Sequence, residues 1–365
     1  MGKEKILHYA AIKGWQEFPL VQKYRDIHIH SGIRNSADCF ALDIIIPHYN
    51  NIKGLKDTLN SIDFHITPIC VTVIDDCSTE RDGFEDLKKD FPMVRFLQME
   101  KNSGPGAARQ KGIENTYYPY IMFIDAGDCI ASRTALLKVI KSIPNYSQAY
   151  VFSYVWWNGD GRKYFKKDST LLPGKIFKRE FIELYHLHFN TTPECSYSNE
   201  DRGFMAPCKI VLEHIASYDK TRRLYFNSDV LYKRILDENS ITQADNGSFY
   251  YYKHIPGLVH NAEHIVNICR ENNLHWKYPA RIITYYLVYL YECYLKCAKE
   301  CPEQLPANLE VLKYFYKHVY KQFELINEKM LEGYYSRAIR YLIKYSCAAV
   351  PRINIRRFLG EIKND

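Results

Sequence analysis

Between Leu42 and Tyr154 the chain alternates short runs of β-branched and other apolar residues with stretches of helical periodicity. This alternation is typical of a parallel sheet built from βαβ units. The predicted strands are Asp43–Ile46, Ile69–Ile74, Val94–Leu97, Tyr120–Ile124 and Ala149–Tyr154. The segments between them predict helices over Lys53–Ile62, Arg81–Lys89, Gly106–Glu114 and Ser132–Ser142. Ligands of such a sheet bind at the carboxyl ends of its strands.

The pattern changes outside this region. Residues 1–40 show weak helical character and are interpreted as an N-terminal extension, whereas residues 160–255 mix Gly, Pro and charged positions with short periodic segments. Beyond about residue 260 the pattern is helical up to Pro351. We therefore expect an α/β domain over 41–258, with halves 41–155 and 156–258, followed by a helical appendage over 259–365.

The composition agrees with a folded protein, with 47% hydrophobic and 25% charged residues. The net charge of +7 suits an anionic ligand, although ordinary solubility charge explains it equally well. The opening residues lack an apolar signal-peptide segment, and the most apolar run, Ile282–Leu295, is interrupted by Glu292. We expect a cytoplasmic protein without a transmembrane segment, with its 11 cysteines reduced.

Polar clusters follow three of the predicted strands. The first strand ends in Pro47-His48-Tyr49-Asn50, the second in Asp75-Asp76-Cys77-Ser78-Thr79, and the fourth in Asp125-Ala126-Gly127-Asp128. Each cluster alone is explained by a turn or a helix cap. Because the carboxyl ends of parallel strands meet at one edge, the three together favour a binding site.

These segments resemble the N-terminal half of family 2 glycosyltransferases, whose motifs are P-x-Y-N, (I/V)-D-D-x-S-T, N-x-G-x-x-x-A-R-x-x-G and an aspartate cluster after a strand. Residues 102–112, NSGPGAARQKG, supply the third motif. Residues 173–181, PGKIFKREF, and 199–204, NEDRGF, resemble the later G-K-x-(F/Y)-(R/K)-R-x-F and E-D-x-x-F segments. The resemblance covers about residues 42 to 210 and excludes both the N-terminal extension and the helical tail.

The resemblance implies a GT-A fold, an α/β architecture in which helices flank a mostly parallel, Rossmann-like sheet, here with a C-terminal helical appendage. Residues 41–155 then bind a nucleotide-sugar, most simply a UDP-sugar, and 156–258 form the acceptor side. A nucleotide base needs a stacking surface and an acceptor for its imide N–H, and Arg109 beside a helix N-terminus suits a diphosphate. The implied nucleotide-sugar-binding residues are Pro47, Tyr49, Asn50, Asp75, Asp76, Asn102, Gly104, Arg109, Asp125 and Ala126.

The resemblance also implies a divalent cation, Mn²⁺ or Mg²⁺, between the aspartates and the diphosphate. Such ions bind carboxylate oxygens together with substrate phosphates. Asp125 and Asp128 are the expected ligands, but Gly127 occupies the position where the family commonly has a metal-binding aspartate. His254, or else His260 or His264, could complete the metal shell, although a solvated or buried histidine explains each of them.

By resemblance Asp201 is the general base that deprotonates the acceptor hydroxyl, with Glu200 as its neighbour. Local sequence alone explains the pair as acids at a helix N-terminus. One base acting in a direct displacement inverts the anomeric configuration. The resemblance therefore predicts an inverting hexosyl- or pentosyltransferase.

Three hypotheses about the partner remain open. The first is non-processive transfer of one sugar to a glycan or surface-polysaccharide precursor, since the Q-x-x-R-W motif of processive synthases is absent. The second is transfer to a hydroxylated base in viral DNA, motivated by the basic tail Arg337–Lys363, which could equally contact an anionic membrane. The third is a catalytically inactive nucleotide- or glycan-binding module, for which Gly127 is the main argument.

Overall fold

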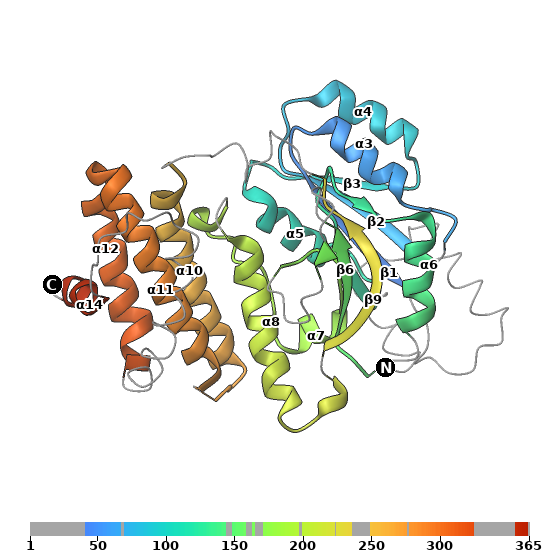
Figure 1. The fold of residues 1–365 in the computed structure, drawn as a ribbon. Helices are drawn as coiled ribbons and strands as arrows, with labels where there is room; N and C mark the ends of the chain where they lie inside the picture. The colour runs from blue at the N-terminus through green and yellow to red at the C-terminus, as the bar shows by residue number, and fades with distance from the viewer. Residues whose placement is uncertain are drawn as a thin grey trace.

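The computed structural model describes residues 41–363 apart from 67–68, 144–147, 158–162, 165–170, 197–198, 223, 236–248, 276 and 325–354. Within these residues a nine-stranded mixed sheet forms the centre of the molecule, in the order β3-β2-β1-β4-β8-β6-β9-β5, with β7 paired to β6. Helices cover both of its faces (Figure 1). The predicted α/β class is confirmed.

The first half of the sheet is parallel. Strands β3, β2, β1 and β4 lie side by side with the same direction. Their bounds are β1 Leu42–His48, β2 Ile69–Asp75, β3 Arg95–Gln98 and β4 Tyr120–Phe123, and the intervening helices are α3 Ile52–Ser61, α4 Arg81–Asp90 and α5 Gly104–Glu114. The sequence pattern therefore placed these elements to within about two residues.

The second half of the sheet departs from a purely parallel pattern. The predicted fifth strand is β6 (Val151–Trp157), but the short strand β8 (Lys175–Lys178) lies between it and β4, antiparallel to both. Strand β9 (Leu224–Lys233) then pairs with β6 and with β5 (Cys129–Ile130), while β7 spans Lys163–Tyr164. Neither β8 nor β9 was predicted from the sequence pattern, because β8 is four residues long and polar residues interrupt β9.

The two faces of the sheet have separate hydrophobic cores. Helices α3, α4 and α6 (Arg133–Ser142) cover one face through Leu59, Leu87 and Val139. On the other face Phe123 and Phe177 pack beneath α5, α7 (Arg179–Leu184) and α8 (Glu200–Ala216). The short 3-10 helices η3 (Pro193–Cys195) and η4 (Lys220–Arg222) flank α8 in the sequence.

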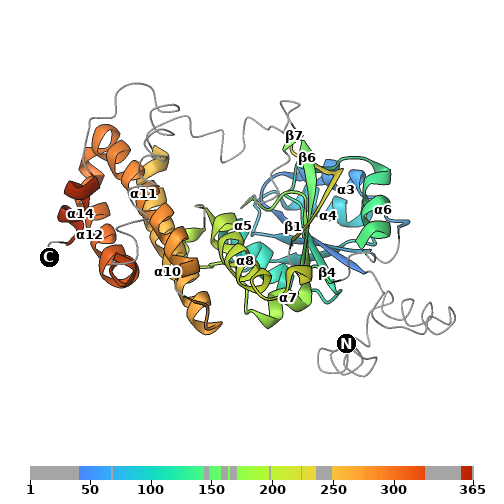
Figure 2. The same ribbon diagram turned by 60° about the horizontal axis from the view of Figure 1, so that its bottom comes forward.

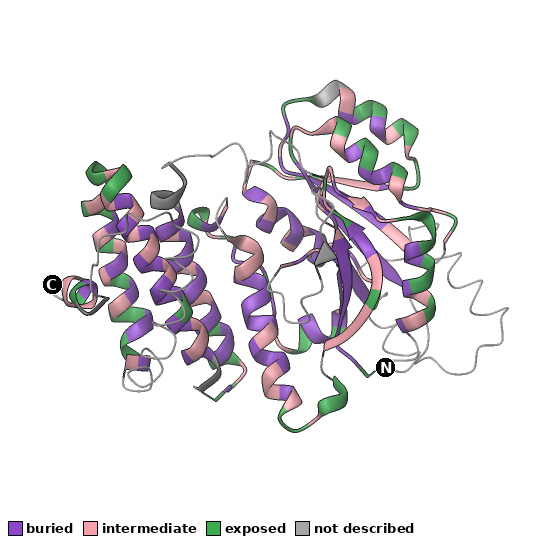
Figure 3. Ribbon diagram, viewed as in Figure 1, coloured by how far each residue is buried: buried purple, intermediate pink, exposed green. Residues whose placement is uncertain are grey.

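The C-terminal helices extend this second core away from the sheet. They are α10 Phe249–Glu271, α11 Lys277–Glu300, α12 Leu305–Phe315 and α14 Ile355–Lys363, with η5 Pro302–Gln304, η6 Tyr316–Tyr320 and η7 Lys321–Phe323. Figures 1 and 2 show them stacked beyond α8, and burial in Figure 3 is concentrated where they face one another. One continuous core includes α8, α10, α11 and α12. The division at residue 258 stays a prediction, and α10 runs through that position.

Two sequence predictions fall wholly or partly outside the described residues: the N-terminal extension 1–40 and residues 337–354 of the basic tail. In the described part of that tail, Arg357 pairs with Glu361 and Lys363 pairs with Glu324. Of the helices described here, none combines the length and the apolar character needed to cross a membrane.

Candidate active site

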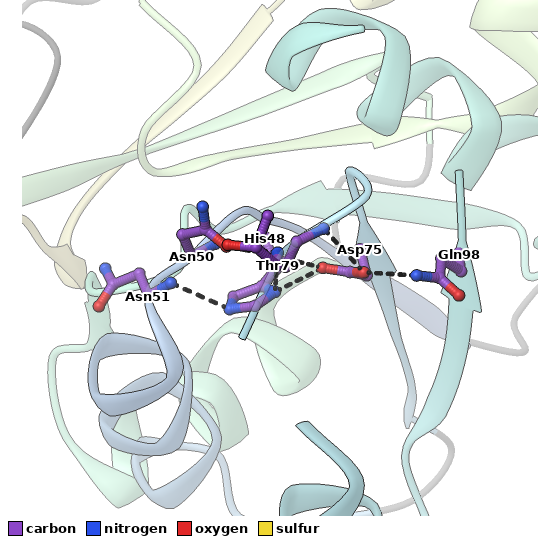
Figure 4. Close-up of polar contacts among 7 residues, drawn as sticks. His48, Asn50, Asn51, Asp75, Thr79 and Gln98 are labelled. Carbon is purple, nitrogen blue, oxygen red and sulfur yellow. Dashed lines mark hydrogen bonds and ion pairs between the residues drawn. The ribbon is translucent and has the colours of Figure 1, made fainter. Parts of the chain in front are cut away.

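The ends of β1 and β2 are joined by a buried polar network. His48 Nδ1 lies 3.0 Å from Asp75 Oδ1, and the Ser78 hydroxyl donates to the same oxygen at 2.5 Å (Figure 4). The Gln98 amide donates to Asp75 Oδ2 at 3.3 Å. Burial by itself would raise the pKa of Asp75, but the hydrogen bonds from His48 and Ser78 outweigh it and lower that pKa. Asp75 is therefore held as a carboxylate in a fixed orientation.

The turn after β1 presents an aromatic ring to solvent. Pro47 is buried at the end of the strand, whereas the Tyr49 side chain is 46% exposed. Asn50 has a left-handed backbone (φ 46°), and its side-chain oxygen accepts the Thr79 N–H at 2.8 Å. The Asn50 N–H in turn donates to Ser78. These contacts fix the turn and leave the Tyr49 ring free to stack on a ligand.

Asp76 fixes the beginning of α5. Its two carboxylate oxygens accept the N–H groups of Ser103 and Gly104 at 2.8 and 2.7 Å. Gly104 has φ +86°, and a Cβ there would lie 1.9 Å from the backbone oxygen of Ser196. Only glycine allows this approach. Asn102, the other predicted residue of this motif, is partly buried just before the helix.

Arg109 connects two segments that are far apart in the sequence. Its guanidinium donates to Asp125 Oδ1 at 2.5 Å and to Glu200 Oε1 at 3.1 Å, and the Arg109 side chain is only 4% exposed. It also lies over the Phe189 ring, 5.8 Å from the centroid. At Gly106 an added Cβ would lie 2.9 Å from Glu200 Cβ, so α5 and α8 approach closely. The predicted donor-side and acceptor-side carboxylates thus meet at one buried cation.

The turn after β4 gives its two aspartates different environments. Gly127 has φ +108°, a conformation that L-residues rarely adopt, so the turn itself requires a glycine where the family commonly has an aspartate. Asp125 is half exposed. Both oxygens of buried Asp128 are occupied, Oδ2 by the Tyr232 hydroxyl at 2.5 Å and Oδ1 by the Ile235 N–H at 2.9 Å. Burial and the charge of Asp125 raise the pKa of Asp128 to about 6.

Asp201 lies in the first turn of α8, next to Glu200. Its Oδ1 accepts the Arg202 N–H at 2.7 Å. Burial, followed by the charge of Glu200, raises the pKa of Asp201 to about 6, while the Arg202 and Arg109 charges oppose this shift. A carboxylate with a pKa near 6 is ionised at neutral pH and can still accept a proton.

Comparison with known proteins identifies this arrangement. The profile described as "Glycosyl transferase family 2" matches residues 43–202, which include every segment that meets at the Arg109 bridge. Residues 43–202 belong to glycosyl transferase family 2. The resemblance noted in the sequence is therefore confirmed for this domain.

Relatives of this domain include bacterial glycosyltransferases named for poly(ribitol-phosphate) and for teichuronic acid. The poly(ribitol-phosphate) beta-N-acetylglucosaminyltransferase TarS of Staphylococcus aureus is 27% identical over 205 residues, 49% of this chain and 35% of TarS. The putative teichuronic acid biosynthesis glycosyltransferase TuaG of Bacillus subtilis is 31% identical over 90 residues, 24% of this chain and 36% of TuaG. The chain thus spans about a third of the length of these relatives.

The fold of this chain also matches solved structures. The structure of S. aureus TarS superposes with a TM-score of 0.56 at 19% identity, covering 82% of this chain and 53% of that one. TarS 1–349 in complex with UDP-GlcNAc gives a TM-score of 0.55 at 20% identity, and the match covers 77% of this chain and 82% of that one. The predicted GT-A fold with C-terminal helices is confirmed.

The histidines proposed for the metal shell lie on α10, beyond the residues that the family profile matches. His254, on α10, is buried, and its Nδ1 lies 3.0 Å from the Asn199 amide, adjacent to Glu200. Ring contact joins His264 to His188, and His260 lies 4.0 Å from Glu194. Among the described residues, no three His, Cys, Asp or Glu side chains are grouped to hold a metal ion. The metal role of His254 and Asp128 stays a prediction.

Three residues that organise the site were not predicted from the sequence. His48 is the last residue of β1 and contacts Asp75, and Tyr232 belongs to strand β9, which the sequence pattern did not predict. Arg179, from the G-K-x-F-K-R segment, is buried and donates to Asp43 Oδ2 at 2.9 Å and to Thr116 at 2.8 Å. Arg179 therefore fastens α7 to the start of β1. The signal available in the sequence was the position of Arg179 within the PGKIFKREF segment, which resembles a family motif.

Proposed function

We propose that this chain transfers a single sugar from a UDP-sugar to a hydroxyl group of a polymeric acceptor, with inversion at the anomeric carbon. The observation that carries the proposal is the buried Arg109 bridge. It joins Asp125, at the end of the donor-binding strands, to Glu200, the neighbour of Asp201. Glu200 is 91 positions and Asp125 is 16 positions from Arg109 in the chain. The bridge thus brings the proposed donor and acceptor sides together, as sugar transfer between two bound substrates requires.

The donor nucleoside would bind across the ends of β1 and β2. The exposed Tyr49 ring offers a stacking surface. A carboxylate can accept about four hydrogen bonds. His48, Gln98 and the hydroxyl and N–H of Ser78 already contact Asp75, whereas Asp76 accepts two N–H groups and can also accept the imide N–H of a uracil. At the N-terminal end of α5 the Ser103 and Gly104 N–H groups already donate to Asp76, so this helix would contribute its dipole alone to a nearby diphosphate.

A divalent cation fits this site through Asp125. The Asp125 carboxylate is half exposed and uses one oxygen toward Arg109, whereas Asp128 is buried and each of its oxygens already accepts a hydrogen bond. Mg²⁺ and similar ions bind through one or two carboxylates together with substrate phosphates and water. When bound, such an ion would neutralise the charge that develops on the leaving diphosphate. We therefore propose Asp125 as the metal-binding carboxylate.

Asp201 would act as the general base. The acceptor hydroxyl gives its proton to the Asp201 carboxylate as its oxygen forms a bond to the anomeric carbon. The bond from that carbon to the UDP oxygen breaks on the opposite face, and UDP leaves with the bonding pair. The pKa of Asp201, raised to about 6 by burial and by Glu200, suits a base that acts near neutral pH.

A polymer is the acceptor that the relatives favour. TarS is named for poly(ribitol-phosphate) and TuaG for teichuronic acid. The DNA hypothesis rested on the basic tail, and its described cations Arg357 and Lys363 are paired with Glu361 and Glu324. We therefore propose a glycan or polyol-phosphate polymer in preference to a nucleic acid.

The test is Asp201→Asn, with Glu213→Gln on the same helix as the matched control. Asparagine keeps the size of the side chain but cannot take the proton, so transfer should fall by about 10²–10⁴-fold. The control should retain transfer, and NMR of the product should show the anomeric configuration opposite to that of the donor. Near-normal transfer by Asp201→Asn, or retention of configuration, would overturn this mechanism.

A further inference from the structure

A cation and three tyrosines meet beside Asp201, where α8 faces α11. Arg202 directly follows Asp201 in the first turn of α8. Tyr285 and Tyr286 are neighbours on α11, and Tyr289 lies about one turn after them. The Arg202 guanidinium lies over the Tyr289 ring, 5.1 Å from its centroid. We call these four residues the seam cluster. It joins the family 2 domain to the C-terminal helices that the family profile does not cover.

Two buried polar groups of the seam cluster lack partners within the described part of the chain. Arg202 Nη1 is shielded from solvent and has no hydrogen-bond acceptor there. The Tyr286 side chain is 3% exposed, and its hydroxyl also has no hydrogen-bond partner there. Leaving a buried donor unsatisfied costs about 1–3 kcal/mol, and more when it is charged. A ligand that accepts from both groups would remove this cost.

The charges around the seam cluster set what such a ligand can be. The Arg202 charge bears on Tyr286 and on His254, where burial and that cation lower the pKa of the imidazole to about 4. His254 is therefore neutral at physiological pH and leaves Arg202 as the cation of this group. A guanidinium beside tyrosine hydroxyls is a typical site for a phosphate or carboxylate.

The seam cluster also reaches solvent. Tyr285 is 52% exposed, and its ring centroid is 6.4 Å from that of Tyr289 at an interplanar angle of 30°. Tyr285 and Tyr289 are four residues apart and so share one face of α11. Their rings offer an apolar surface for the carbon chain of a sugar or a polyol, leading inward to Arg202.

We propose that the seam cluster binds an anionic group of the acceptor, one unit away from the hydroxyl that Asp201 deprotonates. This inference rests on the proposed function and adds the acceptor class: a polyanionic chain of phosphodiesters or acidic sugars. Arg202 pairs with the anion, the Tyr286 hydroxyl donates to it, and Tyr285 with Tyr289 packs on the carbon chain. The cation is needed because Glu200 and Asp201 would otherwise repel such an acceptor.

The test compares acceptors of matched length with the full chain and a UDP-sugar donor. The probes are an oligomer of glycerol phosphate, an oligomer of glucuronic acid and a neutral oligosaccharide. The unaltered protein should use at least one anionic oligomer with a KM at least about tenfold below that of the neutral one, equivalent to about 1.4 kcal/mol. The two anionic arms distinguish phosphate from carboxylate.

Variants assign the preference to the seam cluster. Arg202→Gln should remove the tenfold preference, and Arg202→Lys should restore part of it, because a lysine keeps the charge without the planar fork. Arg281→Gln is the control, since Arg281 lies on α11 like the three tyrosines but pairs with Glu213, near the C-terminal end of α8. If Arg202→Gln does not fold, Tyr285→Ala, at an exposed position, should still raise the KM for the anionic oligomer.

Outcomes against the inference are separable from failure of the proposed function. Release of UDP from the donor without acceptor tests donor chemistry alone. If UDP is released but anionic and neutral oligomers have equal KM values, the seam cluster is not an anion site. The same conclusion follows if Arg202→Gln and Arg281→Gln behave alike. If no donor is turned over, the proposed function itself fails.

Discussion

Replacing Arg109 by methionine tests whether the buried bridge holds the two halves of the site together. The Arg109 side chain is 4% exposed, Glu200 is 17% exposed and Asp125 is 50% exposed. Breaking a buried ion pair by removing one partner costs about 3–5 kcal/mol. Water can reach Asp125, so Glu200 is the carboxylate that bears the full cost of a buried charge without a partner. We therefore expect Arg109→Met to lower the free energy of unfolding by about 2–4 kcal/mol.

Urea unfolding followed by circular dichroism measures this loss. Lys111→Met is the matched control, because Lys111 lies on the same helix and its ammonium donates to the Gln98 carbonyl in an exposed contact. It should change stability by less than about 1 kcal/mol. Adding Glu200→Gln to Arg109→Met should recover part of the loss by removing the stranded charge. Equal effects of Arg109→Met and Lys111→Met would refute the bridge.

Three further predictions concern the glycine turn, the base and the second aspartate. Gly104→Ala combines a clash with backbone and a strained positive φ, so it should destabilise the protein by more than about 2 kcal/mol in urea unfolding; a neutral effect would contradict the close approach. Transfer should fall as pH drops through about 6, because Asp201, whose pKa is raised to about 6, must be deprotonated to act. A rate independent of pH between 5 and 7 would remove Asp201 as the base. Tyr232→Phe deletes the hydroxyl that donates to buried Asp128, and it should cost about 1–3 kcal/mol while raising the pKa of that carboxyl. Unchanged stability would count against that contact.

The parallel half of the sheet could be predicted because its signal is local. Strands β1, β2 and β4 are nearly continuous apolar runs, as strands buried on both faces are, and polar residues mark where they end. Strands β8 and β9 owe their conformation to partners distant in the sequence. Strand β8 pairs with β4 and β6, and β9 reaches Asp128 through Tyr232. No short window of sequence contains that information.

The candidate site shows the same division. The motifs identified Asp75, Asp125 and Asp201 as a set, because each follows a recognisable strand or begins a helix. The motifs could not predict which groups form hydrogen bonds with these aspartates. Arg109 was expected to address the diphosphate, and the structure pairs it with Asp125 and Glu200, a three-body contact that depends on how α5 and α8 pack.

The central claim, that the chain acts on a nucleotide-sugar, is tested most directly by acceptor-free donor hydrolysis. The protein is incubated with Mn²⁺ and one donor at a time: UDP-GlcNAc, UDP-glucose or GDP-mannose. The released nucleoside diphosphate is measured in each assay. We predict slow release of UDP from at least one UDP-sugar, suppressed by a chelator and by Asp125→Asn. Release of no nucleoside diphosphate from any donor would contradict the account and favour a binding module.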